Sequence, residues 1–406
     1  MIGGIILLLD FGSLNVKKLK FIDLWIVIPY LILLGIGVVM VYSASFYNNM
    51  VNGGSTTQYL VKQAFYVVLG LILCYIVFSL RLSILKSRGI LSVLGLITLI
   101  SLIVLLIMGV VNPSSRVNGA SAWLTLGPIN FQPLELAKLV FVLYLALVLS
   151  NKEQRLTDAK FGHIIGDNWR QIAFLLVIIL LVGIQPDFGG AFILGIITLV
   201  MISASSIPTK IISILDGSIV AAGVVFMSVV LIFKPSFLIS GYKYQRIMAM
   251  LHPFQLEQKA GAQLVNSFYA ISNGGIFGVG LGNSIQKRGY LPEPHTDFIL
   301  AIISEELGVI GVLVVLGLLA LIIFRLLLVG LRTKNTYTSL VLYGIATIFF
   351  TQIFLNVGGL LGFIPLTGVT LPFISYGGSS MMILSVALGI ALNLEATEKF
   401  QSKKLR

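Results

Sequence analysis

The sequence predicts an all-α polytopic membrane protein with about ten transmembrane helices, and three observations lead to this class. Of the 406 residues, 57% are hydrophobic and 10% are charged, whereas a typical soluble domain has roughly 25% charged residues. The mean hydropathy is +1.03. Apolar runs of about 20 residues recur along the chain, each long enough to cross roughly 30 Å of hydrocarbon. Because these runs are continuous rather than alternating, the pattern excludes a membrane β-barrel.

Ten apolar runs are predicted to be membrane spans. They lie near residues 24–45, 60–80, 90–111, 134–150, 170–185, 188–206, 211–233, 297–324, 339–361 and 379–395. The connections on the predicted cytoplasmic side are too short for a soluble domain, so residues 1–406 are predicted to form a single integral membrane domain. Cys74 is the only cysteine and lies inside the second run, which excludes disulfides and a cysteine-based zinc site.

The charged residues predict the orientation of these spans. The formal net charge is +12, and the sequence contains 27 Lys and Arg residues. With the N-terminus in the cytoplasm, most of these cations fall before the first span, in the short cytoplasmic connections and in the tail, as the positive-inside rule requires. Both termini are therefore predicted to be cytoplasmic. No basic groove with interleaved aromatic residues is present, so we expect membrane lipids and not nucleic acid around the chain.

Three segments on the predicted outer side are longer or less regular than a simple connection. They are residues 112–133, residues 234–296 between spans seven and eight, and the Gly- and Pro-rich residues 362–378. Irregular backbone at membrane depth is tolerated only against protein or a water-filled cavity. In the second segment, apolar residues recur at helical spacing, which predicts an amphipathic helix that lies on the outer membrane surface or packs across the top of the bundle. They are Leu256, Ala260, Leu264, Phe268 and Ile271.

The stretch GYLPEPHTDFILAIISEELG, residues 289–308, is the most polar part of an otherwise apolar region. Thr296 is predicted to cap a helix, with Asp297 at its first position, where the helix dipole favours a carboxylate. A stripe of small or polar residues then follows one helix face, which indicates either close helix packing or the wall of a cavity. The stripe comprises Asp297, Ala301, Ser304, Gly308 and Gly311.

The other ionisable residues of this stretch have separate interpretations. Glu305 falls about two turns below Asp297 and must be paired or protonated at that depth; Glu306 lies on a different face. Glu293 and His295 are interpreted as loop structure or as substrate contacts. Metal ligation by His295 with Asp297 is a weaker alternative to a loop hydrogen bond.

Three further places combine polar residues with the predicted outer rim. In FQPLELAK, Glu135 and Lys138 are three residues apart and can pair on one helix face, either as a structural ion pair or with Lys138 directed at an anion. In QPDFGG, residues 185–190, Asp187 lies in a tight turn or in a break between two helices. In YKYQRIMAMLHPF, Arg246 belongs to a phosphate- or headgroup-binding patch or to an interfacial belt.

These places indicate chemistry on a phosphorylated lipid. A carboxylate near cations can deprotonate a hydroxyl while the cations stabilise a pyrophosphate leaving group. The residues by themselves do not identify the substrate.

Four motifs in order give this sequence its resemblance to the SEDS (shape, elongation, division and sporulation) family of membrane glycosyltransferases that polymerise peptidoglycan. They are AWLTLGPINFQPLELAK, QPDFGG, GLGNSIQKRGYLPEPHTDFILAIISEELG and PLTGVTLPFISYGGSS. The resemblance covers nearly the whole chain. The segment GNSIQKRGYLPE is more similar to the division member of the family than to the elongation member.

The resemblance implies that the protein joins lipid II to a growing, undecaprenyl-linked glycan with inversion at the anomeric carbon. Asp297 then matches the family's essential aspartate and is the expected catalytic residue, as a general base or as the ligand of a divalent cation such as Mg or Mn. No other cofactor is expected. The residues expected to bind or support the substrate are Trp123, Glu135, Lys138, Asp187, Arg246, Lys287, Glu293, His295 and Glu305.

Two positions differ from the family pattern. Ala122 stands where the family usually has a basic residue before the tryptophan, and Arg116 lies six positions earlier. Leu134 replaces a serine before Glu135. The motif HTDF is unchanged.

The resemblance also implies a partner and a location. The partner is a class B penicillin-binding transpeptidase, together with other division proteins, and the location is the bacterial cytoplasmic membrane at the division septum. The alternatives are an elongation-type polymerase, a lipid II flippase and a non-catalytic division scaffold. A flippase would require cytoplasmic polar residues that mirror the outer ones, and the sequence does not contain them.

Overall fold

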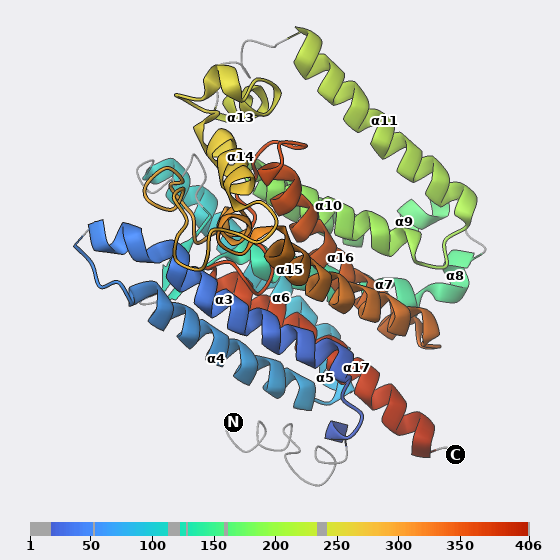
Figure 1. The fold of residues 1–406 in the computed structure, drawn as a ribbon. Coiled ribbons are helices and arrows are strands. Elements are labelled where there is room, and N and C mark those ends of the chain that lie inside the picture. Colours follow the sequence, from blue (N-terminus) through green and yellow to red (C-terminus); the bar gives the residue numbers. More distant parts are fainter. Residues whose placement is uncertain are drawn as a thin grey trace.

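The computed structural model describes residues 18–51, 53–112, 122–126, 129–157, 161–233 and 242–404, and this part of the chain is predominantly helical (Figure 1). The helices are α3 (Leu24–Val51), α4 (Gln58–Ser79), α5 (Leu82–Leu85), α6 (Arg88–Val111), α7 (Pro133–Asn151), α8 (Glu153–Thr157), α9 (Phe161–Ile184), α10 (Phe188–Ser203), α11 (Thr209–Phe233), α13 (Tyr242–Leu251), α14 (Ala262–Gly274), α15 (Ile299–Arg332), α16 (Thr336–Leu360) and α17 (Gly378–Lys404), with a 3-10 turn, η2, at Phe254–Leu256. Strands β1 (Leu124–Leu126) and β2 (Ile129–Phe131) form a small antiparallel hairpin that the sequence analysis did not predict.

The predicted fold class, a polytopic α-helical membrane protein, is confirmed. Each of the ten predicted spans overlaps one long helix, and eight helices in the described part of the chain are long and apolar enough to cross a membrane. Helix α10 is apolar but shorter, with 16 residues. The number of spans and the side on which the termini lie stay predictions.

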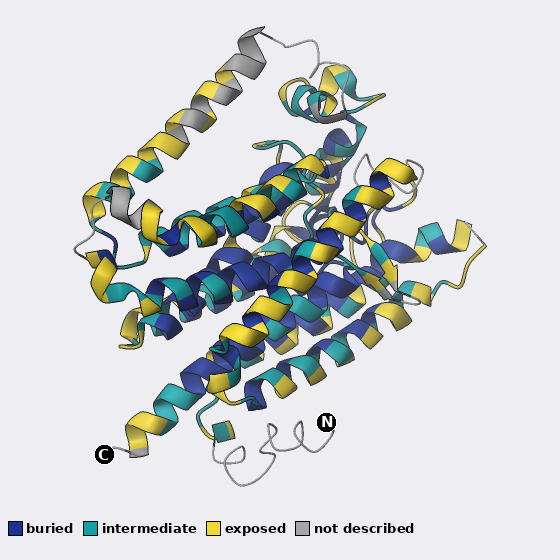
Figure 2. Ribbon diagram, turned by 180° about the vertical axis from the view of Figure 1, so that it is seen from behind, coloured by how far each residue is buried: buried dark blue, intermediate teal, exposed yellow. Residues whose placement is uncertain are grey.

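Three helices form the interior of the bundle. In the apolar 18-residue stretches of α7, α16 and α17, about three quarters of the residues are buried. In the corresponding stretch of α4, 22% are buried. The outer helices carry many exposed residues (Figure 2), and many of these are large and apolar, as expected for contact with lipid. Glycines allow α17 to approach α4 closely, because a Cβ on Gly389 would lie 2.6 Å from the carbonyl oxygen of Cys74. Helix α11 diverges from the bundle in Figure 1.

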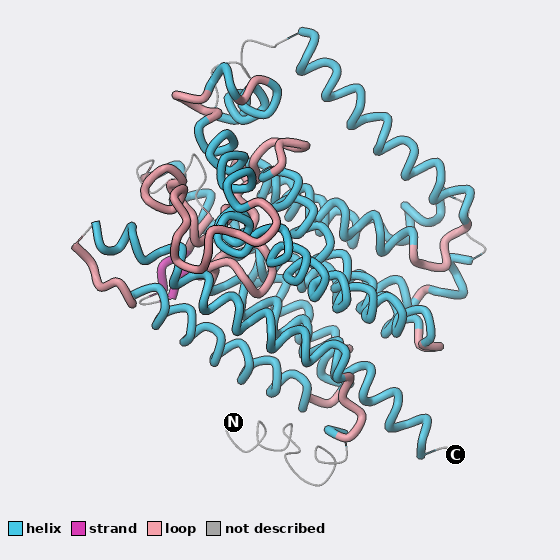
Figure 3. The backbone as a smooth tube through the Cα atoms, viewed as in Figure 1, coloured by secondary structure: helices cyan, strands magenta, loops and turns pink. Residues whose placement is uncertain are grey.

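The two ends of the bundle differ in character. At one end, Phe21 before α3 contacts Phe400 of α17 with ring centroids 5.9 Å apart, and Asp23 pairs with Arg325 at 2.6 Å. The first described residues and the end of α17 therefore lie on the same side of the bundle. The long loops 275–298 and 361–377 gather at the other end (Figure 3).

Helix α15 is interrupted at Gly308, whose φ and ψ are 69° and −171°. The segment that follows α14 pairs with both halves of the break: the N–H of Val279 donates to the carbonyl of Glu305 at 2.9 Å, and the N–H of Val309 donates to the carbonyl of Gly275 at 3.0 Å. A Cβ on Gly308 would collide with the backbone of Ile276. The predicted stripe of small residues therefore serves close packing of backbone against backbone.

Helix α14 lies inside the predicted outer segment 234–296 and packs along α15. Its buried residues include Leu264, Val265 and Ala270, and Phe268 contacts Gly362 of the loop after α16. Of the two arrangements that the apolar spacing allows, the structure has the helix packed on the bundle.

Candidate active site

Asp297 lies in the loop before α15 and not at the first position of that helix. A turn at residues 293–296 precedes the helix, and α15 begins at Ile299 with Phe298 as its N-cap, so Thr296 does not cap it. The hydroxyl of Thr296 donates to Oδ1 of Asp297 at 2.8 Å. Asn356 of α16 donates through Nδ2 to the backbone carbonyl of Asp297 at 2.8 Å. The predicted cap was therefore wrong, because Phe298 is the N-cap of α15 and hydrogen bonds from Thr296 and Asn356 place Asp297.

The surroundings of Asp297 favour a stronger base than an ordinary aspartate. The side chain is partly buried, and burial raises the pKa of the Asp297 carboxyl, while the Thr296 hydroxyl and the Arg246 charge act in the opposite direction. The side chain borders the loop 361–377, where a Cβ on Gly368 would lie 3.9 Å from Oδ2 of Asp297. A carboxylate with a raised pKa holds an accepted proton better near neutral pH.

Glu135 and Lys138 form the ion pair that their spacing predicted. Helix α7 begins at Pro133, and Nζ of Lys138 lies 2.8 Å from Oε2 of Glu135. Both residues are buried, with 4% and 1% of their surface exposed. Leu134, directly before Glu135, packs against Gly190 at the start of α10. The pair therefore lies beside the turn that contains Asp187.

Asp187 caps α10 and lies in a tight turn between two helices. Its Oδ1 accepts a hydrogen bond from the N–H of Gly190 at 2.8 Å. Burial raises the pKa of the Asp187 carboxyl, nearby Lys138 and Arg246 lower it, and Glu135 raises it. These four side chains are therefore close enough to form one electrostatic group.

Arg246 links this group to Asp297. Its charge acts on both Asp187 and Asp297, and its Nη1 donates to the carbonyl of Leu366 in the loop 361–377. Arg246 also lines a pocket of about 210 Å³ with Lys259, Gln245 and Gln263. The structure thus brings four of the predicted places together at one end of the bundle.

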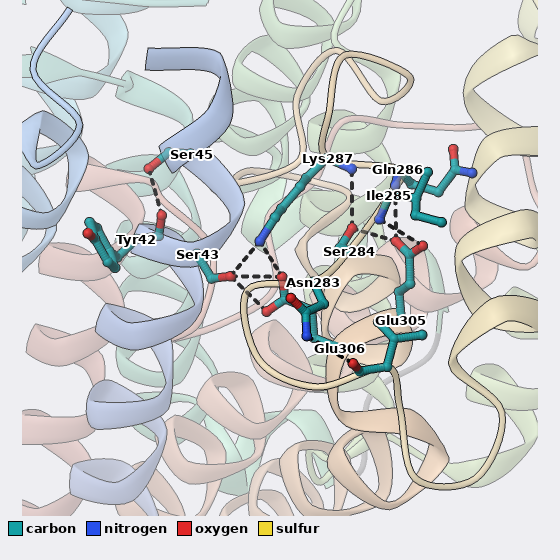
Figure 4. A network of polar contacts seen from close by, with 11 residues as sticks. Tyr42, Ser43, Ser45, Asn283, Ser284, Ile285, Gln286, Lys287, Glu305 and Glu306 are labelled. Carbon is teal, nitrogen blue, oxygen red and sulfur yellow. Dashed lines mark hydrogen bonds and ion pairs between the residues drawn. The ribbon is translucent and has the colours of Figure 1, made fainter. Parts of the chain in front are cut away.

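Lys287 and Glu305 lie instead in a separate buried cluster, which we call the latch (Figure 4). Nζ of Lys287 is 2.6 Å from Oε1 of Glu306 and 3.0 Å from Oγ of Ser43 on α3. Ser43 donates to the same carboxylate at 2.7 Å. Lys287 is therefore engaged by protein groups and is not directed at the Asp297 site.

Glu305 holds the other half of the latch. Its carboxylate accepts hydrogen bonds from the N–H groups of Ile285 and Gln286 at 3.1 and 3.2 Å and from the hydroxyl of Ser284. Glu305 and Glu306 have no exposed surface. The latch therefore fixes residues 284–287 to α3 and α15, and the chain continues from there to Asp297.

His295 is part of an aromatic cluster that the sequence analysis missed. Its ring centroid lies 4.3 Å from that of Tyr59 and 5.7 Å from that of Tyr376. Burial lowers the pKa of His295 to about 4, so the ring is neutral at pH 7. The neighbouring Glu293 has 54% of its side chain exposed, and burial and the charge of Asp297 raise the pKa of its carboxyl.

Trp123 begins the hairpin and has 39% of its surface exposed. The hairpin is tied to the start of α17, because the hydroxyl of Ser379 donates to the carbonyl of Asn130 at 2.6 Å and accepts from the N–H of Gln132 at 3.1 Å. Arg116, the basic residue six positions before Ala122, lies outside the described residues.

Several residues that form these contacts were not predicted from the sequence. Ser43 and Glu306 are polar residues inside apolar spans, and such a position generally indicates a buried partner. Ser379 and Tyr376 lie in the motif PLTGVTLPFISYGGSS but show no spacing that points to the hairpin or to His295. Within the described part of the chain, no group of three or more His, Cys, Asp or Glu residues is placed to hold a metal ion.

The comparison with protein families matches residues 24–400 of this chain to a family of cell cycle proteins, FtsW/RodA/SpoVE. Among the similar proteins, a probable peptidoglycan glycosyltransferase FtsW of Lactococcus lactis is 39% identical over 406 residues, covering 95% of each chain. The FtsW of Enterococcus hirae is 37% identical over 392 residues, again covering 95% of each chain. The stage V sporulation protein E of Bacillus subtilis is 32% identical.

Solved structures show the same arrangement of helices. A chain from a peptidoglycan synthase complex that coordinates polymerization and crosslinking matches 94% of this chain and 99% of its own length, with a TM-score of 0.71 and 28% identity. The rod shape determining protein RodA of Thermus thermophilus matches with a TM-score of 0.64 and 27% identity, covering 92% of this chain and 96% of its own.

Proposed function

The chain belongs to the FtsW/RodA/SpoVE family, the SEDS family that its motifs indicate, and from this membership we propose that it polymerises lipid II into β-1,4 glycan strands. Relatives that are 39% and 37% identical are named probable peptidoglycan glycosyltransferase FtsW, which supports this enzyme class and the division member of the family. The observation that carries the proposal is the convergence of Asp297, Arg246 and Lys138 with its partner carboxylates at one end of the bundle.

The residues divide the chemistry between acceptor and leaving group. The 4-hydroxyl of the acceptor sugar attacks the anomeric carbon of the donor, and its proton passes to the carboxylate of Asp297. The bond from that carbon to the pyrophosphate oxygen breaks, undecaprenyl pyrophosphate leaves with the bonding electrons, and the configuration inverts. Arg246 and Lys138 stabilise the negative charge on the leaving group, with Lys138 oriented by Glu135. Because pyrophosphate is already a stable anion, no strong general acid is needed.

The proposal also includes a divalent cation at the same site. Mg²⁺ is usually bound by one or two carboxylates together with substrate phosphates, so it does not need a group of three protein ligands. Asp297, with Glu293 in electrostatic range, is the carboxylate that would hold it. Such a cation would neutralise charge on the pyrophosphate.

We propose two further features of the biology. The solved synthase complex couples polymerization with crosslinking, which supports a transpeptidase partner for this chain. The similarity to FtsW supports a place at the division septum. Lys287 and Glu305 act in this proposal as supports of the loop that carries Asp297, while Trp123, Glu293 and His295 border the substrate.

The test is polymerisation of lipid II by the purified protein together with its transpeptidase partner. Replacing Asp297 by Asn removes the proton acceptor at nearly constant volume, so polymerisation falls by roughly 10²–10⁴-fold. The control is Glu257→Gln, a carboxylate on the same outer segment that bonds to Tyr269 and keeps full activity. Normal polymerisation by the Asp297→Asn protein would refute the assignment.

Two additional experiments distinguish a general base from a cation ligand and a polymerase from a flippase. A chelator leaves activity unchanged if Asp297 acts only as a base and abolishes it if a cation is required. Translocation of lipid II across vesicles without polymerisation would favour a flippase instead of a polymerase.

A further inference from the structure

A second pocket lies between α6, α7 and α9, away from Asp297. It has a volume of about 280 Å³ and is lined by Arg88, Leu91, Ser92, Tyr144, Leu147, Val148, Asn151, Lys152 and Gln171. Arg88 begins α6 and Asn151 ends α7. Lys138 lies near the start of α7, so roughly 20 Å of helix axis separates the two sites. The pocket opens at the end of the bundle that the charge distribution predicts to face the cytoplasm.

The inner part of the pocket is apolar. Leu91 and Leu147 are buried there. Phe174 of α9 packs over Gly95, where a Cβ would lie 3.0 Å from Cζ of the ring. The Phe174 ring centroid also lies 5.4 Å from that of Tyr144. These contacts join α6, α7 and α9 next to Tyr144, which lines the pocket.

The rim carries two cations, and no carboxylate lines the pocket. Nζ of Lys152 donates to Oδ1 of Asn168 at 2.7 Å and to the carbonyl of Asp167 at 2.9 Å, so neutral oxygens hold it in place without cancelling its charge. Arg88 is exposed at the start of α6. Neither cation forms an ion pair with a carboxylate within the described residues.

An apolar recess with two cations at its rim, one of them held in place, matches a molecule that has a phosphate headgroup and an acyl chain. Basic pockets between membrane helices bind anionic headgroups in this way. The outward surfaces of α6 and α9 beside the pocket are apolar and exposed at Val93, Leu96 and Val177, which provides a path for the chain. We propose that this pocket is a binding site for an anionic phospholipid of the surrounding membrane.

The proposal does not depend on the polymerase activity and is tested by binding. The full-length protein in detergent is titrated with phosphatidylglycerol or phosphatidylcholine, and the bound lipids are counted by native mass spectrometry. Each cation strengthens binding of an anionic lipid by roughly fivefold. Arg88→Gln therefore weakens phosphatidylglycerol binding by about fivefold, and Arg88→Gln with Lys152→Gln by about 25-fold, while phosphatidylcholine binding stays unchanged.

Two variants make the test specific. Ser92→Trp fills the pocket while both cations remain, and it abolishes the binding. Arg332→Gln removes an exposed cation at the end of α15, outside the pocket, and leaves the binding unchanged. Thermal unfolding of each variant confirms the fold.

Other outcomes overturn the proposal. Equal losses in the Arg332→Gln and Arg88→Gln proteins would mean that the cations act only as diffuse charge. Equal binding of the two lipids would remove the selectivity for anions. Competition by free glycerol phosphate as strong as that by phosphatidylglycerol would identify a phosphate site and not a lipid site.

Discussion

Glu135 and Lys138 pair across one turn of α7, whereas Lys287 and Glu306 pair between a loop and an interrupted helix. Both pairs are buried, and each joins one lysine to one glutamate. Their surroundings differ. The carboxylates of the latch accept hydrogen bonds from Ser43 and from backbone N–H groups, while the α7 pair has Asp187 and Arg246 as charged neighbours.

This difference separates structural from chemical roles. A buried charge that protein groups fully satisfy is fixed in place and cannot engage a substrate without losing those bonds. In a group of neighbouring cations and carboxylates beside a loop, a cation can exchange its carboxylate partner for a bound anionic ligand. The latch is therefore expected to position Asp297, and the α7 pair to act on the pyrophosphate.

The largest expected effect comes from breaking the latch. Lys287→Met leaves the carboxylate of Glu306 buried without its cation, which costs roughly 3–5 kcal/mol in the free energy of unfolding. The measurement is thermal or denaturant unfolding of the purified protein in detergent. A Lys287→Met protein as stable as the wild type would mean that the pair contributes nothing to the position of the loop.

The next prediction compares the same double substitution, Lys→Met with Glu→Gln, in both pairs. Removing both partners avoids an unpaired buried charge, so Lys287→Met with Glu306→Gln regains most of the stability lost in the single variant. It also retains polymerisation. Lys138→Met with Glu135→Gln is similarly stable but polymerises roughly 10²-fold more slowly, because a donor to the leaving group is lost.

The contrast between these two double variants is the decisive readout. If both polymerise equally well, the α7 pair is structural like the latch, and Arg246 must act on the leaving group without Lys138. If both lose activity while they remain folded, the latch takes part in the chemistry.

The α7 pair could be predicted from the sequence because its two residues are close together along the chain. Pro133 marks the helix start, and a spacing of three residues places Glu135 and Lys138 on one face. The latch joins residues 19 and 263 positions apart, so no local spacing indicates it. The same limit applies to Thr296: the motif fits a cap, but a turn at residues 293–296 comes first and the helix begins at Ile299.

The fold groups residues of separate family motifs that no local residue pattern connects. Asp187 and Arg246 appeared in the sequence as a turn and as a surface patch, and only the fold places both within range of the α7 pair. The break at Gly308 has no separate sequence signal, because a glycine among small residues also fits a continuous helix. Its left-handed φ of 69° depends on the inserted segment 275–280.

The smallest predicted effect concerns His295, which lies on the chain between the latch and Asp297. Its pKa of about 4, against an ordinary 6.5, means that the folded protein favours the neutral ring. The stability that this preference provides is complete above the ordinary pKa and is lost as the pH falls toward 4. Between pH 7 and pH 5 the loss is about 2 kcal/mol.

His295→Phe keeps an aromatic ring between Tyr59 and Tyr376 and removes this titration. Unfolding of the wild type should therefore respond more steeply than that of the variant over pH 7 to 5, by about 2 kcal/mol. Partial compensation comes from Glu293, whose carboxylate lies 3.9 Å from Nε2 of His295 and would attract a protonated ring. Identical pH responses would show that the loop opens to water around His295. The position of Asp297 would then depend on the latch alone.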